Sequence, residues 1–170
     1  MQFKEEFMIK SPSGEGKMLL VDGMLGSLSR KLRVLGYDTV YDSKSSDKNL
    51  LKFAKDTGRI LVTADADLFL TAKRAKTDSI LVSSRTEHKR LFEVLSKIGA
   101  HGINDSVVAR CSVCNGELKD SGRVNHVSTV YTCVACGKDY WKGSHWKNLS
   151  ELFHEVDAEL RKTRMNLKAS

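Results

Sequence analysis

The sequence predicts an α/β protein in which helices sandwich a parallel β-sheet and a small C-terminal zinc ribbon follows. Two observations predict the sheet: short apolar runs suited to buried strands alternate with segments of helical periodicity, and glycines end most of these helical segments. A third observation, a repeated Cys-x-x-Cys pair, predicts the ribbon. A chain of 170 residues with 41% hydrophobic content can bury one sizeable core and a small appendage.

Four strand-then-helix units are expected in order along the chain. The strands are predicted at residues 18–21, 39–41, 60–63 and 79–82, and the helices at 25–35, 50–57, just after Asp67 and, opened by a capping box at Ser84, up to Ile98. Strands that alternate with helices in this way form a parallel sheet, because right-handed crossovers place helices on its two faces.

The chain divides into four predicted segments. They are an N-terminal extension (1–16), the sheet domain (17–106), the zinc ribbon (107–147), and a C-terminal helix and tail (148–170). The last helix is predicted from apolar residues at helical spacing between Leu149 and Leu160, which suits a docked or partner-binding helix.

The net charge and the apolar segments of the chain indicate which partners and which cellular location to expect. The 28 Lys and Arg residues outnumber the 21 Asp and Glu residues, and the net charge of +7 favours polyanions, although any one basic group can be a solvated helix face. No stretch reaches the roughly 18 apolar residues that span a bilayer, and the N-terminus lacks a signal-peptide hydrophobic region. We therefore expect a cytoplasmic protein with no membrane partner, whose cysteines serve metal or redox chemistry rather than disulfides.

The four cysteines form two pairs separated by 18 residues, a spacing typical of a four-thiolate zinc site: Cys111, Cys114, Cys133 and Cys136. A thioredoxin-like redox pair is the alternative, and it fits poorly because neither pair stands between a strand and a helix of the sheet domain. We predict one structural zinc ion with no open coordination position for catalysis.

Aspartates follow the predicted strands. Asp22 comes after the first strand, Asp65 and Asp67 come after the third, and Asp47 stands at the start of the second helix. The carboxyl ends of parallel strands meet at one edge of a sheet, where ligands gather. Converging carboxylates repel one another unless a hard cation such as Mg²⁺ or Mn²⁺ binds them, and such a cation can activate water and orient a phosphodiester.

Two other interpretations account for the same aspartates. Asp22 can open an Asp-Gly turn, while Asp47 and Asp67 can cap helices. A phosphoacceptor domain also places aspartate at strand ends, but a dehalogenase-like domain needs its Asp-x-Asp pair after the first strand, and here the pair follows the third.

Aromatic and basic residues interleave after the second cysteine pair. Such a surface can stack bases and track phosphates, which makes candidate RNA-binding residues of Trp141, Lys142, His145 and Trp146. Alternatively, the tryptophans anchor a ribbon too small to own a core against the sheet domain. The two roles are compatible.

Five motifs resemble the Mut-seven C-terminal ribonuclease family over about residues 18–148. They are LVDGMLG (20–26), LRVLGYD (32–38), LVTAD (61–65), RCSVCNG (110–116) and YWKGSHW (140–146). The resemblance implies a PIN-like nuclease domain fused to a zinc ribbon, with RNA as partner and an acidic metal site at Asp22, Asp47, Asp65 and Asp67.

One departure from the family pattern concerns phosphate binding. The family often carries arginine beside its third-strand aspartate, where this chain has Ala64 and Ala66. Arg30 and Arg33 are expected, as the resemblance also suggests, to supply the positive charge instead.

The sequence therefore predicts a Mg²⁺- or Mn²⁺-dependent ribonuclease, endonucleolytic in action, whose aspartates hold the catalytic cation and whose zinc ribbon assists RNA binding. The alternative is a non-catalytic RNA-binding or assembly factor that retains a PIN-like fold.

Overall fold

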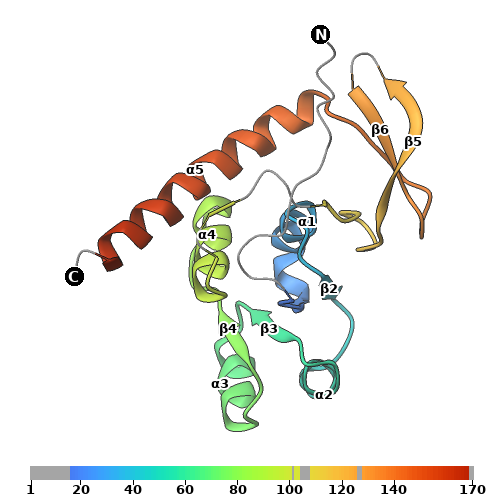
Figure 1. The fold of residues 1–170 in the computed structure, drawn as a ribbon. Coiled ribbons are helices and arrows are strands. Elements are labelled where there is room, and N and C mark those ends of the chain that lie inside the picture. Colours follow the sequence, from blue (N-terminus) through green and yellow to red (C-terminus); the bar gives the residue numbers. More distant parts are fainter. Residues whose placement is uncertain (1–15, 101, 104–107, 126–127, 169–170) are drawn as a thin grey trace.

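The computed structural model describes residues 16–100, 102–103, 108–125 and 128–168 (Figure 1). The predicted N-terminal extension lies outside the described residues apart from Gly16. In chain order the elements are β1 (Leu19–Asp22), the 3-10 turn η1 (Gly23–Leu25), α1 (Gly26–Val34), β2 (Thr39–Asp42), α2 (Asp47–Thr57), β3 (Ile60–Thr63), α3 (Ala66–Arg74), β4 (Ser79–Leu81), α4 (Glu87–Lys97), β5 (Leu118–Asn125), β6 (Ser128–Cys133), β7 (Asp139–Tyr140) and α5 (Ser144–Lys168). None of the described helices has the length and apolar character that crossing a bilayer requires.

The first four strands form a parallel sheet in the order β2-β1-β3-β4. Leu19 of β1 lies opposite Thr39 of β2 on one side and Ile60 of β3 on the other, and Leu61 of β3 lies opposite Ser79 of β4. All four carboxyl ends therefore lie at one edge. Each predicted strand agrees with the observed one to within a residue, and the predicted parallel α/β class is confirmed.

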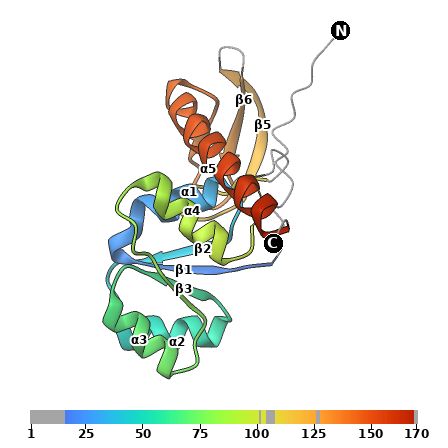
Figure 2. The same ribbon diagram turned by 90° about the vertical axis from the view of Figure 1, so that its left-hand side faces the viewer.

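Helices cover both faces of this sheet (Figure 2). Alternation along β1 sets the two faces, because successive side chains of a strand point to opposite sides. Leu19 and Val21 are buried with leucines of α1 and α4, whereas Leu20 is buried with residues of α2 and α3. Burying each of these side chains contributes on the order of 2 kcal/mol, so the alternation holds helices on both faces.

The start of α4 differs from the sequence prediction. Thr86, rather than Ser84, is the N-cap, and its Oγ1 accepts a hydrogen bond from the Lys89 N–H at 3.3 Å. Ser84 belongs to the loop before the helix, where its N–H donates to Glu93 Oε2 at 3.1 Å. The Glu93 carboxylate, farther along α4, thus binds the backbone of Ser84 in the loop before the helix. The sequence around Ser84 alone could not indicate this contact.

Helix α5 begins four residues before the predicted boundary at 147/148, so that boundary lies inside the helix. The carbonyl of Gly143 accepts the Trp146 N–H at 3.0 Å where the helix starts. The prediction relied on an apolar period beginning at Leu149, and the first turn is polar apart from Trp146. Farther along, α5 packs on α4 and joins the core of the sheet through Phe153, Val156 and Leu160.

Strands β5, β6 and β7 form a small antiparallel sheet, which together with the two cysteine turns, before β5 and between β6 and β7, is here called the ribbon (Figure 1). The ribbon contacts the sheet domain where α1 ends and β2 begins. The Arg110 N–H donates to the Arg33 carbonyl at 2.8 Å, and the Thr39 N–H donates to Asn115 Oδ1 at 3.0 Å. Because Thr39 is the first residue of β2, the ribbon lies at the amino edge of the parallel sheet.

Candidate functional site

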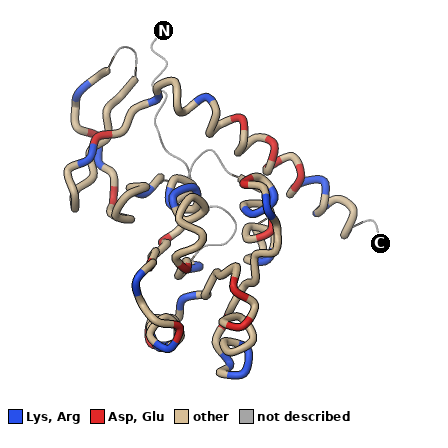
Figure 3. Tube along the Cα trace, turned by 180° about the vertical axis from the view of Figure 1, so that it is seen from behind, with Lys and Arg blue, Asp and Glu red and all other residues tan. Residues whose placement is uncertain are grey.

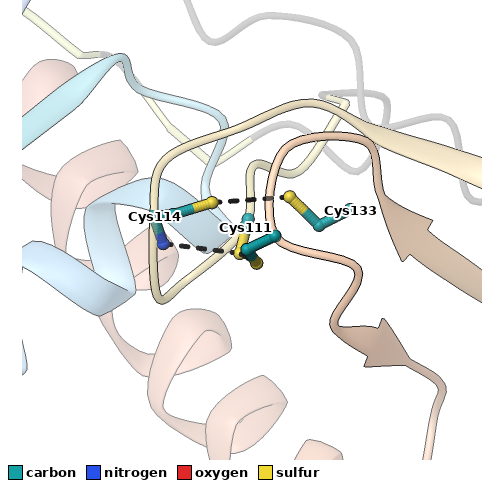
Figure 4. Close-up of side chains that lie close together, drawn as sticks. Cys111, Cys114 and Cys133 are labelled. Carbon is teal, nitrogen blue, oxygen red and sulfur yellow. Dashed lines mark hydrogen bonds between the residues drawn. The ribbon is translucent and has the colours of Figure 1, made fainter.

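The four cysteine thiols converge in the ribbon, with all sulfur atoms within 4.8 Å of one another. Figure 4 shows Cys111, Cys114 and Cys133 close together. Cys111 Sγ lies 3.6 Å from Cys136 Sγ, and Cys114 Sγ lies 3.4 Å from Cys133 Sγ. A disulfide needs about 2.05 Å between sulfurs, so these thiols are not paired covalently. Four sulfurs at about 2.3 Å from a tetrahedral zinc ion lie about 3.8 Å apart, close to the observed separations. The cysteines are therefore placed to bind a metal ion.

The two cysteine pairs sit in matching turns. The N–H of Asn115 donates to the Cys111 carbonyl at 2.9 Å, and the N–H of Gly137 donates to the Cys133 carbonyl at 2.9 Å. Asn115 and Gly137 both adopt left-handed conformations, with φ of 69° and 73°. Glycine and asparagine are the residues that tolerate this conformation best, which explains their place directly after each pair.

Gly116 allows the two turns to approach closely. A Cβ atom at this position would lie 2.9 Å from Cys133 Sγ and 3.3 Å from Cys114 Sγ. Such distances are too short for a carbon beside sulfur, so only glycine lets the first turn reach the sulfurs of both pairs. This close approach fits a compact four-thiolate metal site.

The thiols differ in acidity. Burial raises the pKa of Cys111, but hydrogen bonds from Tyr140 Oη at 3.0 Å and from backbone N–H groups outweigh burial and lower the pKa to about 6. The N–H of Gly116 lowers the pKa of Cys114, whereas burial and hydrogen bonds with the other three thiols raise it to about 12. Four thiolates this close repel one another, so full deprotonation requires a bound cation.

Arg33 is placed differently from the sequence prediction, which assigned it to RNA. Its side chain is buried, with 6% exposure. Its Nε donates to the Thr39 carbonyl at 2.8 Å, and its Nη1 donates to the carbonyls of Ser112 and Val113 at 3.0 and 2.9 Å. The guanidinium therefore joins α1 and β2 to the first cysteine turn and does not reach solvent for a phosphate contact.

A second, partly buried contact joins the ribbon to the sheet domain at Asp38. Arg59 Nη1 and Nη2 donate to the two carboxylate oxygens at 2.9 and 3.0 Å, and Asn115 Nδ2 donates to Oδ1 at 2.7 Å. Burial raises the pKa of Asp38, but hydrogen bonds from Arg59 and Asn115 outweigh burial and lower it. Sequence analysis missed this contact, and the one available sign was asparagine in a position that favours glycine.

The predicted acidic residues all lie toward the carboxyl edge of the parallel sheet. Thr63, a fully buried residue that ends β3, connects two of them: its Oγ1 donates to Asp22 Oδ2 at 2.7 Å and accepts from the Asp65 N–H at 2.9 Å. Asp65 is the N-cap of α3, and its Oδ1 accepts the N–H groups of Asp67 and Leu68 at 2.7 and 3.1 Å. The Thr63 hydroxyl therefore links Asp22 at the end of β1 to the backbone of Asp65 after β3.

Asp47 and Asp67 are exposed first-turn residues of α2 and α3. Neither Asp47 nor Asp67 is the N-cap of its helix, because Ser46 and Asp65 occupy the N-cap positions of α2 and α3. A group of three or more His, Cys, Asp or Glu residues with ligand atoms within 4.8 Å of one another could hold a metal ion. Within the described residues, the four cysteines are the only such group. The four aspartates thus share an edge in an open arrangement.

Asp42 is an acid at this edge that sequence analysis did not consider. It ends β2 and lies directly opposite Asp22 in the strand register. Hydrogen bonds from the Ser45 side chain and from the N–H groups of Lys44 and Ser45 lower its pKa. Its carboxylate therefore already closes the turn after β2. Its position after a strand, the same sign that pointed to Asp22, could have identified it.

A pocket of about 390 Å³ lies where α1, the ribbon and the first turn of α5 meet. Its lining includes four of the predicted RNA-binding residues, Arg30, Trp141, His145 and Trp146, but not Lys142. Lys and Arg occur in both the sheet domain and the ribbon (Figure 3), so the pocket is one part of a broadly basic molecule. The fold thus brings together aromatic residues of the ribbon side and an arginine of α1.

The pocket and the aspartates lie at different ends of the sheet domain. The ribbon contacts the amino edge, and the aspartates lie at the carboxyl edge; a four-residue strand spans about 13 Å. Helix α1 runs between the two regions. Ser27 in its first turn and Val34 at its end both line the pocket, so the pocket extends along α1 toward the carboxyl edge.

Comparison with known protein families gives one match. The Mut7-C RNAse domain matches residues 17–153, which include the aspartates, the cysteines and the pocket residues. Neither the curated proteins nor the solved structures gave a match. The family is named for ribonuclease, which indicates a ribonuclease-type function and RNA as the molecule bound. With most of its length matched, from β1 into α5, this chain belongs to the Mut7-C RNAse domain family.

Proposed function

We propose that this protein is a ribonuclease that hydrolyses RNA phosphodiester bonds endonucleolytically at the carboxyl edge of its parallel sheet, with Mg²⁺ or Mn²⁺ as cofactor. The observation that carries the proposal is the 2.7 Å hydrogen bond from Thr63 Oγ1 to Asp22 Oδ2 in a member of a ribonuclease family. This bond orients the carboxylate after β1 from the neighbouring strand β3, next to Asp65.

The donor atoms at this edge suit a hard cation. Thr63 occupies Asp22 Oδ2, and the helix cap occupies Asp65 Oδ1, so each carboxylate keeps one oxygen without a hydrogen bond among the described residues. Mg²⁺ usually binds only one or two carboxylates and completes its shell with water and phosphate oxygens. The open arrangement of the aspartates is therefore compatible with a site that the RNA phosphate completes.

The four aspartates would act as two pairs with different roles. Asp22 and Asp65 would hold the cation, and a bound cation would lower the pKa of a water ligand and offset phosphate charge. The exposed Asp47 and Asp67 would complete the acidic edge and orient the attacking water, as their positions at the starts of α2 and α3 permit.

The ribbon would support binding rather than chemistry. We infer that its cysteines hold zinc, because four thiolates in a closed tetrahedral site are typical of structural zinc. A site with four protein ligands leaves no position for a reacting water. The pocket beside the ribbon would bind RNA through Arg30 and the two tryptophans, with Lys142 on the neighbouring surface.

The test is cleavage of a circular single-stranded RNA by the zinc-loaded protein with added Mn²⁺ or Mg²⁺. A circle has no ends, so only an endonuclease can open it. We expect opening of the circle that depends on the divalent ion and is lost in the Asp22→Asn, Asp65→Asn double variant.

A matched control removes two aspartates from the opposite end of the sheet. Asp56 lies in the last turn of α2 and Asp78 directly precedes β4, so both lie toward the amino edge. The Asp56→Asn, Asp78→Asn variant carries the same net charge as the first variant and should cleave like the wild type. Equal cleavage by the wild type and the Asp22, Asp65 variant would rule out the proposed site, and cleavage of linear RNA alone would indicate an exonuclease.

The open arrangement of the aspartates also favours a second candidate, a non-catalytic RNA-binding or assembly factor. The two candidates differ in divalent-ion binding. Isothermal titration with Mn²⁺ should show binding that the Asp22→Asn, Asp65→Asn variant loses if the protein is a nuclease. RNA binding without Mn²⁺ binding or cleavage would support the assembly factor instead.

A further inference from the structure

The pocket beside the ribbon has the size and the walls of a site for a flat aromatic ligand. Its volume of about 390 Å³ falls in the range of small-molecule sites. Aromatic side chains from separate segments line it: Tyr131 of β6, Tyr140 of β7, Trp141 and Trp146. Rings from several directions can stack on an inserted base.

The charge of the lining favours an anion beside that ring. No Asp or Glu is among the residues that line the pocket. Lys31 is paired with Glu87 at 2.9 Å, and Arg110 Nη1 donates to the Asn115 carbonyl at 3.1 Å. Within the described part of the chain, the side chain of Arg30 makes no hydrogen bond or ion pair, so its guanidinium is available to a phosphate.

The backbone at Gly143 lies close beside the side chain of Trp141. Its side chain is 48% exposed, so one part of the ring remains open to a ligand. A Cβ atom on Gly143 would lie 3.1 Å from Trp141 Nε1, so glycine lets the chain pass closely beside the indole. The chain at Gly143 thus restricts one edge of the indole, and restricting a ring before the ligand binds lowers the entropic cost of binding.

We propose that this pocket binds an unpaired nucleobase of single-stranded RNA, with Arg30 on the adjoining phosphate. The biological substrate in this inference rests on the proposed ribonuclease function. A paired base is stacked within its duplex and is not free to insert between protein rings, whereas an unpaired base can be splayed out and stacked on aromatic side chains. The pocket runs along α1 from Val34 to Ser27, so a strand that leaves it past Ser27 would run toward the carboxyl edge of the sheet.

Tryptophan fluorescence can measure binding in the pocket. The chain contains two Trp residues, and both line the pocket, so intrinsic fluorescence reports directly on its occupant. The zinc-loaded protein is titrated, without added Mg²⁺ or Mn²⁺, with oligoadenylate and with the same strand annealed to oligouridylate. We expect saturable quenching by the single strand and much weaker quenching by the duplex. Equal quenching by both, or none by either, would overturn the proposal.

Paired variants test the assigned contacts. Binding is measured by the anisotropy of a fluorescein-labelled oligoadenylate, which does not depend on the protein's own fluorophores. Trp141→Ala should weaken binding by about tenfold or more. Arg30→Ala should weaken it and reduce the slope of log K against log salt by about one, whereas Arg74→Ala, an exposed arginine of α3, should do neither. Equal effects of Arg30→Ala and Arg74→Ala would mean general electrostatic attraction instead of a site.

Gly143→Ala tests the positioning of Trp141 without removing any contact group. The added methyl would lie 3.1 Å from Trp141 Nε1, so the indole must shift by a few tenths of an ångström. Affinity for the single strand should therefore fall by less than in Trp141→Ala, while zinc content and far-ultraviolet circular dichroism stay unchanged. Unaltered affinity would count against the positioning of Trp141 by the chain at Gly143. Quenching without cleavage would support this inference while overturning the proposed nuclease, and cleavage without quenching would do the reverse.

Discussion

Asn115 Nδ2 lies 2.7 Å from Asp38 Oδ1, so the residue directly after the second cysteine of the ribbon is bonded to the residue directly before β2. The same side chain accepts the Thr39 N–H through its Oδ1 at 3.0 Å. One amide thus contacts both the last loop residue and the first strand residue at the amino edge. Because these atoms are partly buried, neither partner would be well solvated if the amide were removed.

This contact predicts a specific loss of stability. Asn115→Gly keeps the backbone free to adopt its left-handed φ of 69° but removes both side-chain bonds. We expect a loss of about 1–3 kcal/mol in the free energy of unfolding. Asn115→Ala should lose about 1 kcal/mol more, because alanine is strained in that conformation. Urea unfolding of the zinc-loaded proteins measures both, and wild-type stability in the glycine variant would show that the bonds contribute nothing.

Arg30 and Arg33 lie one turn apart on α1 and should show opposite phenotypes. Arg33→Gln should lower the free energy of unfolding by about 3 kcal/mol, because it takes the charged donor from three carbonyl acceptors that are buried or partly buried. Arg30→Gln should change stability by less than about 0.5 kcal/mol, since its side chain is exposed. RNA affinity, measured by anisotropy, should fall for Arg30→Gln. A stable Arg33→Gln protein with weakened RNA binding would contradict the internal role of Arg33.

Gly116→Ala should lower zinc affinity. Its methyl carbon would lie 2.9 Å from Cys133 Sγ, so one cysteine turn must move. We expect a loss of about tenfold or more, in line with other changes around metal ligands, measured by competition with a chromogenic chelator. The control is Gly122→Ala in β5, which has a φ of 68° but no atom within 4 Å of the added Cβ. That variant carries backbone strain alone, and an equal zinc loss in both would rule out the steric explanation.

Stability should depend on pH through Glu93. Burial raises the pKa of Glu93, but hydrogen bonds from Lys97 and Ser84 outweigh burial and lower the pKa to about 2 from its ordinary value of 4.5. A carboxyl whose folded pKa is lowered adds stability that is complete above about pH 4.5 and is lost as the pH falls toward about 2. Such a shift corresponds to about 3 kcal/mol.

Glu93→Gln should therefore be about 3 kcal/mol less stable than the wild type at pH 7. The difference should shrink in urea titrations repeated below pH 4.5. The control is Glu155→Gln on the exposed surface of α5, which should match the wild type at every pH. A difference between Glu93→Gln and the wild type that stays constant with pH would contradict the assignment.

The strands, the cysteine site and the family could be predicted because each depends on neighbours in sequence. Leu19, Leu20 and Val21 are an apolar run whatever surrounds them, and a Cys-x-x-Cys pair is contained in four residues. The carboxyl-edge position of Asp22 and Asp65 also followed, because parallel strands share an edge.

The role of Arg33 could not be predicted, because it depends on residues far away in the chain. The sequence prediction assigned Arg33 to a phosphate contact, which needs an exposed side chain. In the structure its guanidinium instead donates to the carbonyl of Ser112, which is 79 residues later. The pocket is similar, since Arg30 and Trp141 meet only through docking of the ribbon. The distances between the aspartates could not be predicted either, because the order of strands and helices gives the edge of the sheet where they lie but not their separation.

The route of the chain through the ribbon has a consequence for folding. Residues 98–143 leave the end of α4 and return as α5, which packs back on α4. The ribbon is therefore a long excursion between two helices of one core. Metal binding by the four cysteines would join residues 111 and 136 and roughly halve the length of the flexible loop between α4 and α5. A loop of half the length has an entropic cost of closure lower by about 0.6 kcal/mol. Zinc would thus favour the packing of α5 on α4, although α5 contributes no ligand to the metal.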